Sequence, residues 1–465
     1  MAELARAAIV QLTPAWLIFG ICSSWRGIHL QASAQGQGYV LLSDNFSVIV
    51  SHPARQAIVY HRPRGAEQMG INVTLLTGLY YKPNSFPYFL TRWLPARRRT
   101  AMTELLELRR MEGLSPDNVT TLFGPALECA YKAGVLSLRT WWAIWDWLAA
   151  RWIQFRRRSN RTVLIHCFIE CSLRTLRAAR SKGMTRILEV TLPPLLADQA
   201  QMSKWGVSES DLPNDISGLK KELAEADFVL VQSEFGVRTI EALGFPASRI
   251  LRIHLGLDTE EFRPRAGTRL PGRLRVIFVG QLNRRKGVHH LLQAWKELNP
   301  DGAELLLAGN THSAPPELLT SIAGTPNCRA LGHLKKKELI SFYQQADLLV
   351  HPSLAEGGCA AIYEALGCGL PCIVSSNSTS AVRSGIEGLV FPTGDVTALK
   401  TAMRELLADA TRRQAMSISA RERAERSLSL AAFSREIAEI YRGVAERSDK
   451  CGTAGASESR LVTAF

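Results

Sequence analysis

The sequence predicts an α/β protein made of two doubly wound parallel sheets, on three observations. Apolar runs typical of buried strands alternate with helical patterns in both halves of the chain. With 465 residues, the chain is long enough for two domains of ordinary size. A segment rich in glycine, proline and arginine at 265–273 separates the halves. We therefore expect the domain boundary at residue 265.

Apolar runs define the elements that we expect in the first half. The predicted strands cover 46–50, 71–77, 163–167 and 228–232. A helix interrupted by Pro63 is expected over 54–69, and an amphipathic last helix over 430–445. The expected organisation is an N-terminal extension at 1–44, domains at 45–265 and 266–428, a C-terminal helix at 429–447, and a flexible tail at 448–465.

The segment 1–44 contains an apolar run at 7–22 that is shorter than the roughly 20 residues of a membrane-spanning helix. A secretory signal is the alternative interpretation. The mixed charge at the start, the interruptions at Pro14 and Trp16 and the lack of a small-residue cleavage site argue against it. We interpret the segment as an extension whose role the sequence does not indicate.

Charge and cysteine content narrow the class of protein. The net charge of +14 indicates an anionic partner, which could be a nucleotide diphosphate, an acidic membrane face or nucleic acid. The nine cysteines include no Cys-x-x-Cys pair, which fits a reduced cytosolic protein better than a disulfide framework. The sequence indicates no metal site.

A strand, a tight turn and a helix follow one another at 347–367, a pattern typical of a ligand crevice. The run 347–351 predicts a buried strand, Gly357 and Gly358 permit a tight turn, and 360–367 predicts a helix. The N-terminus of that helix would direct backbone amides into the crevice, where a diphosphate would be favoured.

Two carboxylates flank this turn. Glu356 precedes it, and Glu364 lies a little over one turn into the helix, so the pair can address hydroxyl groups on either side of a diphosphate. This arrangement suits a sugar nucleotide. The alternative is two carboxylates on solvated surfaces, the usual place for glutamate.

A second loop begins after Gly280, at the end of a predicted strand. Arg285 and Lys286 can reach over a diphosphate from this loop, while a helix that begins near Gly287 adds backbone amides. Such cations would neutralise a nucleotide diphosphate as it leaves. The alternative is a pair of surface cations at a helix start.

Three segments in this order, 276–287, 356–364 and 388–395, resemble the landmarks of retaining GT-B glycosyltransferases of family 4, or glycosyl transferases group 1. The resemblance runs from about 47 to 443. It implies two Rossmann-like domains facing each other across a crevice, the first on the acceptor side and the second holding the donor. It also implies that the C-terminal helix crosses back to the first domain.

The resemblance assigns roles to single residues. Glu364 would bind the ribose hydroxyls, and Glu356 would contact the transferred sugar. A donor phosphate oxygen would accept the acceptor's proton, so that configuration is retained with no metal and no cofactor other than the nucleotide-sugar co-substrate. The implied donor-binding residues are Gly280, Gln281, Gly357, Gly358, Cys359, Ala360 and Glu364. Gln281 stands where many relatives carry arginine, and Gly357-Gly358-Cys359 departs from the commoner Gly-Phe-Gly.

The first domain offers fewer candidates. His166 ends the predicted strand 163–166, and strand ends of this kind face the crevice of an open parallel sheet. We therefore count it with Glu356, Arg285 and Lys286 as a catalytic candidate, against the alternative of a structural histidine. The acceptor-side candidates are Ser51, His52, Glu170 and Ser172.

One predicted helix holds half of the ten tryptophans, namely Trp141, Trp142, Trp145, Trp147 and Trp152. One face would carry Trp141, Trp145, Leu148, Trp152 and Phe155. Nearby arginines are Arg151, Arg156, Arg157 and Arg158, with a further group at Arg92, Arg97, Arg98 and Arg99. The helix either lies in a membrane interface with this face inserted or packs in the core of the first domain.

The resemblance and these patterns together predict a cytoplasmic glycosyltransferase, peripheral on the inner face of the membrane, that transfers a hexose-type sugar from a nucleotide diphosphate to a glycan or lipid-linked acceptor. Synthesis of a cell-surface polysaccharide or glycolipid is the expected setting. A sugar-nucleotide 2-epimerase on the same fold is one alternative. A basic nucleic-acid-binding protein is another, although no interleaved basic and aromatic motif supports it.

Overall fold

The computed structural model describes residues 45–458. Within that range it leaves out 54–56, 83–91, 94, 108–109, 112, 123–133, 158, 160, 195, 197–198, 209–210, 212–214, 266, 268–271, 313 and 380. The predicted extension at 1–44, Arg158 and the side chains of Arg97 and Arg98 therefore lie outside the described part of the chain.

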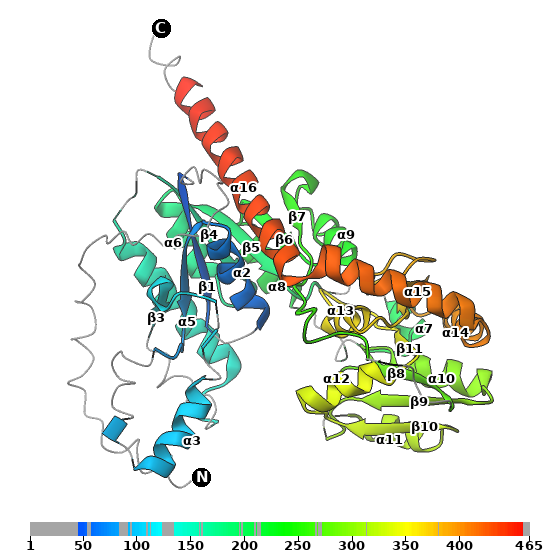
Figure 1. Ribbon diagram of the computed structural model, residues 1–465. Coiled ribbons are helices and arrows are strands. Elements are labelled where there is room, and N and C mark those ends of the chain that lie inside the picture. The colour runs from blue at the N-terminus through cyan, green and yellow to red at the C-terminus, as the bar shows by residue number, and fades with distance from the viewer. Residues whose placement is uncertain are drawn as a thin grey trace.

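The first half folds around a parallel sheet of seven strands in the order β3-β2-β1-β4-β5-β6-β7 (Figure 1). The strands are β1 (Phe46–His52), β2 (Asn72–Thr77), β3 (Val119–Thr121), β4 (Thr162–Phe168), β5 (Thr185–Val190), β6 (Phe228–Val231) and β7 (Ile250–Arg252). Helices α2 (Ala57–Gln68), α3 (Ala96–Glu107), α5 (Leu138–Phe155), α6 (Leu173–Ser181), α7 (Gln199–Lys204), α8 (Ile216–Leu223) and α9 (Glu234–Ala242) connect them.

The second half has a parallel sheet of six strands in the order β10-β9-β8-β11-β12-β13. The strands are β8 (Leu274–Val279), β9 (Ala303–Ala308), β10 (Cys328–Gly332), β11 (Leu348–His351), β12 (Cys372–Ser375) and β13 (Gly388–Phe391). The helices are α10 (Val288–Leu298), α11 (Pro316–Ala323), α12 (Lys336–Gln344), α13 (Ala360–Gly367), α14 (Val396–Ala408) and α15 (Ala410–Arg423). The predicted fold class, two doubly wound parallel sheets, is confirmed.

Each sheet carries an apolar core on both faces, as continuous apolar strands require. In the first half, α2 packs on one face, and α5, α6, α8 and α9 cover the other. In the second half, α12, α13 and α15 cover one face, and α10, α11 and α14 cover the other. The predicted boundary at residue 265 falls between β7, which ends at Arg252, and β8, which begins at Leu274.

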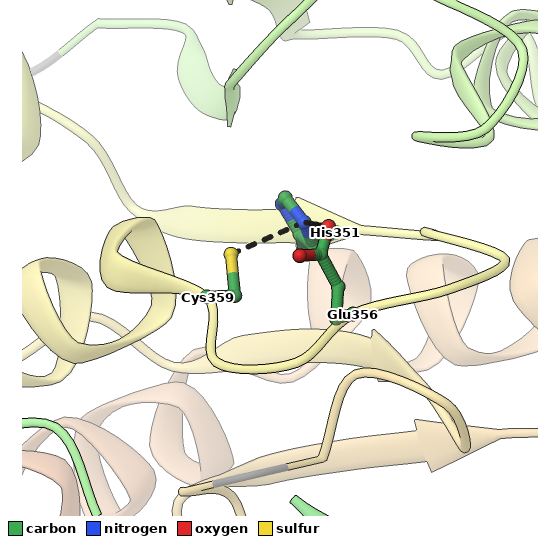
Figure 2. Close-up of side chains that lie close together, drawn as sticks. All are labelled: His351, Glu356 and Cys359. Carbon is green, nitrogen blue, oxygen red and sulfur yellow. Dashed lines mark hydrogen bonds and ion pairs between the residues drawn. The ribbon is translucent and has the colours of Figure 1, made fainter. Parts of the chain in front are cut away.

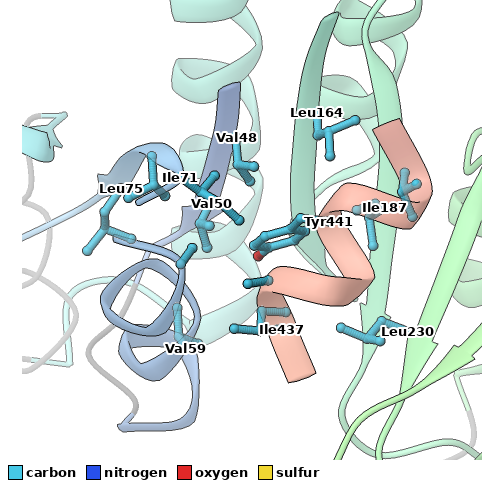
Figure 3. Close-up of a cluster of buried hydrophobic side chains, with 14 of the residues drawn as sticks. Val48, Val50, Val59, Ile71, Leu75, Leu164, Ile187, Leu230, Ile437 and Tyr441 are labelled. Atoms are coloured by element: carbon cyan, nitrogen blue, oxygen red, sulfur yellow. The ribbon is translucent and has the colours of Figure 1, made fainter. Parts of the chain in front are cut away.

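The last helix, α16 (Leu430–Glu458), begins beside the second half and runs back along the first (Figure 1). A five-residue π-helical segment, Ala424–Leu428, joins it to the preceding helix. Figure 3 shows Ile437 and Tyr441 of α16 among apolar side chains of β1, β4, β5 and β6. The helix continues past residue 447, where we expected a flexible tail to begin.

Under α16 lies a buried polar cluster centred on Glu189 of β5. Arg62 of α2 donates two hydrogen bonds to this carboxylate, at 3.0 and 2.7 Å, and both side chains are fully buried. His166 Nε2 lies 3.0 Å from Glu189 Oε2, and its Nδ1 lies 2.7 Å from the Tyr441 hydroxyl. Burial would raise the pKa of Glu189, but Arg62 and His166 outweigh it and lower that pKa to about 2.

The tryptophan-rich helix is α5, and of the two alternatives left open for it, packing in the core holds for Trp141 and Trp145. Trp141 and Trp145 are 3% and 0% exposed and pack in the first half, with Ile153 buried beside them. Phe155, at the end of the same stripe, is 72% exposed, and Trp147, which lies outside the stripe, is 52% exposed. Aromatic side chains at helical spacing are typical both of a helix face packed in a core and of one inserted into a membrane. Here the sheet covers most of that face.

Among the described residues, none of the helices combines the length and the apolar character needed to cross a bilayer.

Replacing Glu189 with glutamine should destabilise the protein by about 3 kcal/mol or more, because Arg62 would keep its buried charge without a counter-charge. In the wild type, the folded-state pKa of Glu189 lies below its ordinary 4.5, so its contribution is complete above pH 4.5 and is lost as pH falls to about 2. Thermal unfolding should therefore give Glu189→Gln a lower Tm than the wild type at pH 7. Between pH 4.5 and about pH 2, its Tm should fall less than that of the wild type.

Glu425→Gln is the matched control, since Glu425 forms a solvent-exposed pair with Arg421. It should change stability by less than about 1 kcal/mol. Equal losses in both variants would contradict a special role for the buried pair.

Candidate functional site

The predicted donor loops lie where the second sheet reverses its strand order. Strands β8 and β11 are neighbours in the sheet but are separated in the chain by β9 and β10. The loop 280–287 follows β8, and the loop 352–359 follows β11, so both leave the same carboxyl edge. Open parallel sheets bind their ligands at such a point.

These two loops are packed tightly against each other. Gly287 adopts φ +69°, and a Cβ at this position would lie 2.0 Å from the carbonyl oxygen of Pro352. The amide of Leu354 donates to the Arg285 carbonyl at 2.8 Å, and the Ser353 hydroxyl donates to the same oxygen at 3.2 Å. The backbone therefore fixes Arg285 and Lys286 beside the segment that carries Glu356.

The carboxylate of Glu356 is the electrostatic centre of the site. Lys286 Nζ forms an ion pair with Glu356 Oε1, and Arg285 Nη1 lies 3.7 Å from the same oxygen. His351 Nε2, at the end of β11, lies 3.3 Å from it (Figure 2). Burial would raise the pKa of Glu356, but Lys286, His351 and Arg285 outweigh it and hold that pKa well below its usual range. Glu356 is therefore ionised at neutral pH.

Glu364 has a different environment. It lies in α13, half-buried, and its Oε2 accepts a hydrogen bond from the Tyr343 hydroxyl at 2.8 Å. Burial raises the pKa of Glu364, and the bond from Tyr343 only partly opposes this. No cation that the structure describes forms a salt bridge with Glu364. Tyr343 therefore orients the carboxylate without neutralising it.

Between the two glutamates, the backbone at two positions stays accessible to a ligand. Gly358 is half-buried and Ala360 is exposed. Cys359 is the N-cap residue of α13, and its side chain makes no capping hydrogen bond, so the first amides of the helix are left for another acceptor. On the facing loop, Gly280 is half-buried and Gln281 is exposed. The structure thus gathers all predicted donor-binding residues around one edge.

The first half lies directly on the Gly357-Gly358 turn. A Cβ on Gly357 would lie 1.6 Å from the Thr191 carbonyl oxygen, and one on Gly358 would lie 2.5 Å from Gln232 Oε1. The Ser233 hydroxyl donates to the Glu356 carbonyl at 3.1 Å. Only glycine leaves room for these contacts, which explains both glycines.

An apolar contact reinforces this meeting of the halves. Leu354 and Ala355 of the second half form a buried cluster with Trp205, Val207 and Phe235 of the first. The Gly206 carbonyl also accepts a hydrogen bond from Arg284 Nη1 at 2.6 Å. The loop that carries Glu356 is thereby covered by the first half.

The structure places His166 away from these residues. Strand β4 ends at Phe168, past the predicted end at 166 or 167, so His166 lies inside the strand and not at its carboxyl end. Its side chain points to the face covered by α16, where Glu189 and Tyr441 hold it at 0% exposure. Burial lowers its pKa despite Glu189. In this arrangement it is a structural histidine, the alternative left open above.

The acceptor-side candidates lie at the carboxyl edge of the first sheet. Ser51 and His52 end β1 and are buried, and the His52 ring packs edge-on against Phe168 at 5.1 Å. Glu170 and Ser172 follow β4, and both backbone amides donate to the buried carboxylate of Glu222, at 2.9 and 3.0 Å. Glu170, exposed and with φ +72°, is the most accessible of the four.

Three residues at this site were not identified from the sequence. His351 was taken only as the end of a strand, Tyr343 had no assigned role, and Gln232 was the last residue of a predicted strand. The position of His351 at a strand end was an available signal, since such residues face the crevice. Nothing local marked Tyr343 or Gln232, because their contacts join separate elements.

Comparison with known proteins finds a family match over part of the chain and a shared fold. Residues 260–423 match the family described as Glycosyl transferases group 1. The chain is similar to D-inositol 3-phosphate glycosyltransferase of Corynebacterium urealyticum, at 31% identity, over 47% of this chain and 57% of that protein. It is also similar to the GDP-mannose-dependent alpha-(1-6)-phosphatidylinositol monomannoside mannosyltransferase of Mycolicibacterium smegmatis, at 27% identity, over 46% and 62% of the two chains.

The alignments thus span 57% and 62% of these relatives' own lengths. Among solved structures, Anabaena Alr3699/HepE in complex with UDP is similar over 85% of this chain and 100% of that chain, with a TM-score of 0.56 and 16% identity. At this identity the likeness shows the fold alone, which is GT-B. Neither relative named here is an epimerase.

Replacing Gly357 with alanine should lower the Tm, because the new Cβ would require the turn or the 191–192 backbone to move. Overpacking of this kind costs about 1–3 kcal/mol. Gly443→Ala is the control, since no heavy atom lies within 4 Å of a Cβ at that helical position. It should leave the Tm unchanged or raise it. A Gly357→Ala protein as stable as the wild type would contradict the contact between the halves.

Proposed function

Since residues 260–423 carry a Glycosyl transferases group 1 domain, we propose that this protein is a glycosyltransferase that moves a sugar from a nucleotide-diphosphate donor to a glycan or lipid-linked acceptor. The observation that carries the proposal is the ion-pair cluster between β8 and β11, where the second sheet reverses its strand order. There Lys286 and Arg285 form ion pairs with Glu356. This cluster supplies both a diphosphate site and a carboxylate for sugar hydroxyls.

The two cations would change partner when a donor binds. A nucleotide diphosphate brings more negative charge than a single carboxylate, so Lys286 and Arg285 would move toward the phosphates. Glu356, ionised and freed from Lys286, would then accept hydrogen bonds from the transferred sugar. As the glycosidic bond breaks, the cations would stabilise the charge that develops on the leaving diphosphate.

Glu364 would accept hydrogen bonds from the ribose. Its carboxylate is oriented by Tyr343 and is half-buried, so it can accept from two neighbouring hydroxyls without a competing cation. The free amides at the start of α13 would lie between the two glutamates and receive the diphosphate.

In this proposal the reaction retains anomeric configuration and uses no metal. Glu356 is held ionised by Lys286 and is therefore a poor proton donor, which argues against a general-acid role. A donor phosphate oxygen would accept the acceptor's proton on the face from which the sugar leaves. The nucleotide sugar would be the only co-substrate.

The acceptor would enter from the first half, past Glu170. Synthesis of a polysaccharide or glycolipid in the cytoplasm is the setting that we propose, in keeping with the two relatives, whose names describe transfer to an inositol phosphate and a phosphatidylinositol mannoside. A peripheral membrane contact would have to use exposed side chains of α5, such as Trp147 and Phe155.

Purified protein titrated with UDP-, GDP- and ADP-sugars should show a selective rise in Tm with one donor, because a ligand that binds only the folded state stabilises it. Glu364→Ala should abolish this rise by removing the proposed ribose contact. Glu422→Ala, which changes an exposed carboxylate on α15, should keep it. A Tm that no nucleotide sugar changes, or an equal rise in Glu364→Ala, would overturn the proposed donor site.

Lys286→Ala should reduce turnover by about 10²-fold or more, as expected when one group that stabilises a developing charge is removed. The measurement is slow hydrolysis of the donor identified above, followed by release of the nucleotide diphosphate. Lys400→Ala, at an exposed ion pair with Glu297, should leave the rate unchanged. Equal rates in wild type and Lys286→Ala would show that this ammonium does not act on the leaving group.

A further inference from the structure

His351, Glu356 and Cys359 converge on one point beside the proposed donor site. Cys359 Sγ lies 3.2 Å from His351 Nε2, which in turn lies 3.3 Å from Glu356 Oε1 (Figure 2). All three side chains are buried, and their ligand atoms lie within 4.8 Å of one another. They come from one short segment, the end of β11 and the loop that leads to α13.

The geometry does not fit a nucleophilic triad. In such a triad, the carboxylate contacts one ring nitrogen and the nucleophile contacts the other. Here both the thiol and the carboxylate contact Nε2, while Nδ1 of His351 has no hydrogen-bond partner among the described residues. One ring nitrogen can offer at most one proton to its two neighbours. The three groups therefore share a centre and do not form a relay.

Three ligand atoms around one centre are typical of chelation. In a tetrahedral zinc site with bonds of 2.0–2.3 Å, the ligand atoms lie roughly 3.3–3.7 Å apart. The sulfur–nitrogen and nitrogen–oxygen distances of 3.2 and 3.3 Å are already close to this spacing. We propose that His351, Glu356 and Cys359 bind a soft divalent cation of the Zn²⁺ class, with a fourth coordination position left to water.

The ligand types select the metal. Thiolate and imidazole favour Zn²⁺ or Co²⁺, whereas Mg²⁺ takes oxygen ligands and would find only Glu356 here. On binding, the Cys359 thiol gives its proton to solvent, and the sulfur coordinates as thiolate.

Lys286 opposes the metal. Its ammonium pairs with Glu356 Oε1, the oxygen that the metal would take, so one cation must displace the other. Arg285 Nη1, at 3.7 Å, adds a weaker repulsion. The Lys286 side chain has a flexible stem and can move toward solvent. Lys286 therefore sets the affinity of the metal, and its removal should strengthen binding.

Metal binding would compete with the sugar donor, an inference that rests on the function proposed above. The metal would hold Glu356 and turn it away from the transferred sugar. The cation is thus an inhibitor in this proposal and takes no part in the reaction. The binding site itself depends only on the three side chains and not on the identity of any substrate.

The test is a titration of the full-length protein with Co²⁺, followed by its thiolate-to-cobalt charge-transfer absorption. We expect one equivalent to bind and Zn²⁺ to remove the band. Cys359→Ser should lose the band, His351→Ala should weaken binding by about tenfold or more, and Lys286→Ala should tighten it. Cys328→Ser, at a half-buried thiol on β10, should behave as wild type.

A band that survives in Cys359→Ser, or that disappears in Cys328→Ser, would overturn the site. The Tm of every variant without metal reports whether it folds, and Cys359→Ala is the second variant if Cys359→Ser does not. The competition is measured separately, as the loss of donor-induced stabilisation when Zn²⁺ is added. If Zn²⁺ leaves the donor-induced rise in Tm unchanged, the competition is overturned and the metal site is not. If Co²⁺ binds to these three residues but no nucleotide sugar raises the Tm, only the proposed function is overturned.

Discussion

The buried carboxylate of Glu189 links elements from across the first half: helix α2, strand β4, the residue after β6 and, through His166, helix α16. It accepts from Arg62 of α2 and from Gln232 after β6, at 2.6 Å in the latter case, and it lies against His166 of β4. His166 in turn contacts Tyr441 of α16. A buried charge is tolerated only with its partners in place, so the cluster fixes the helices that cover one face of the sheet. Through Gln232 it also reaches the turn at Gly358.

That turn is where the halves constrain each other. Thr191 and Gln232 occupy the space that side chains at 357 and 358 would need, so these two positions must be glycine. Many members of the family that this segment resembles carry phenylalanine at the second position. Here Gln232 fills that space, and its orientation is set by Glu189. Core packing of the first half thereby determines the shape of the proposed sugar site in the second.

The charge of Glu356 is already balanced by neighbouring side chains before any ligand binds. It is buried, ionised and surrounded by Lys286, Arg285 and His351, so its charge is neutralised by groups that a substrate can draw away. A diphosphate would attract the two cations, whereas a soft metal ion would displace Lys286 and recruit Cys359. Both events act on the same resting ion pair, because one carboxylate oxygen receives all of these contacts.

The sequence by itself determined the two parallel sheets, the strand–turn–helix segment at 347–367 and the placement of Arg285, Lys286, Glu356 and Glu364 around one edge. These follow from local periodicity and from the rule that parallel strands end at the same edge. Only the tertiary structure decided that His166 and Trp145 are buried and that Gln232 meets Gly358. The Tyr441 that holds His166 is 275 residues away, and local patterns carry no information about which distant element covers a face.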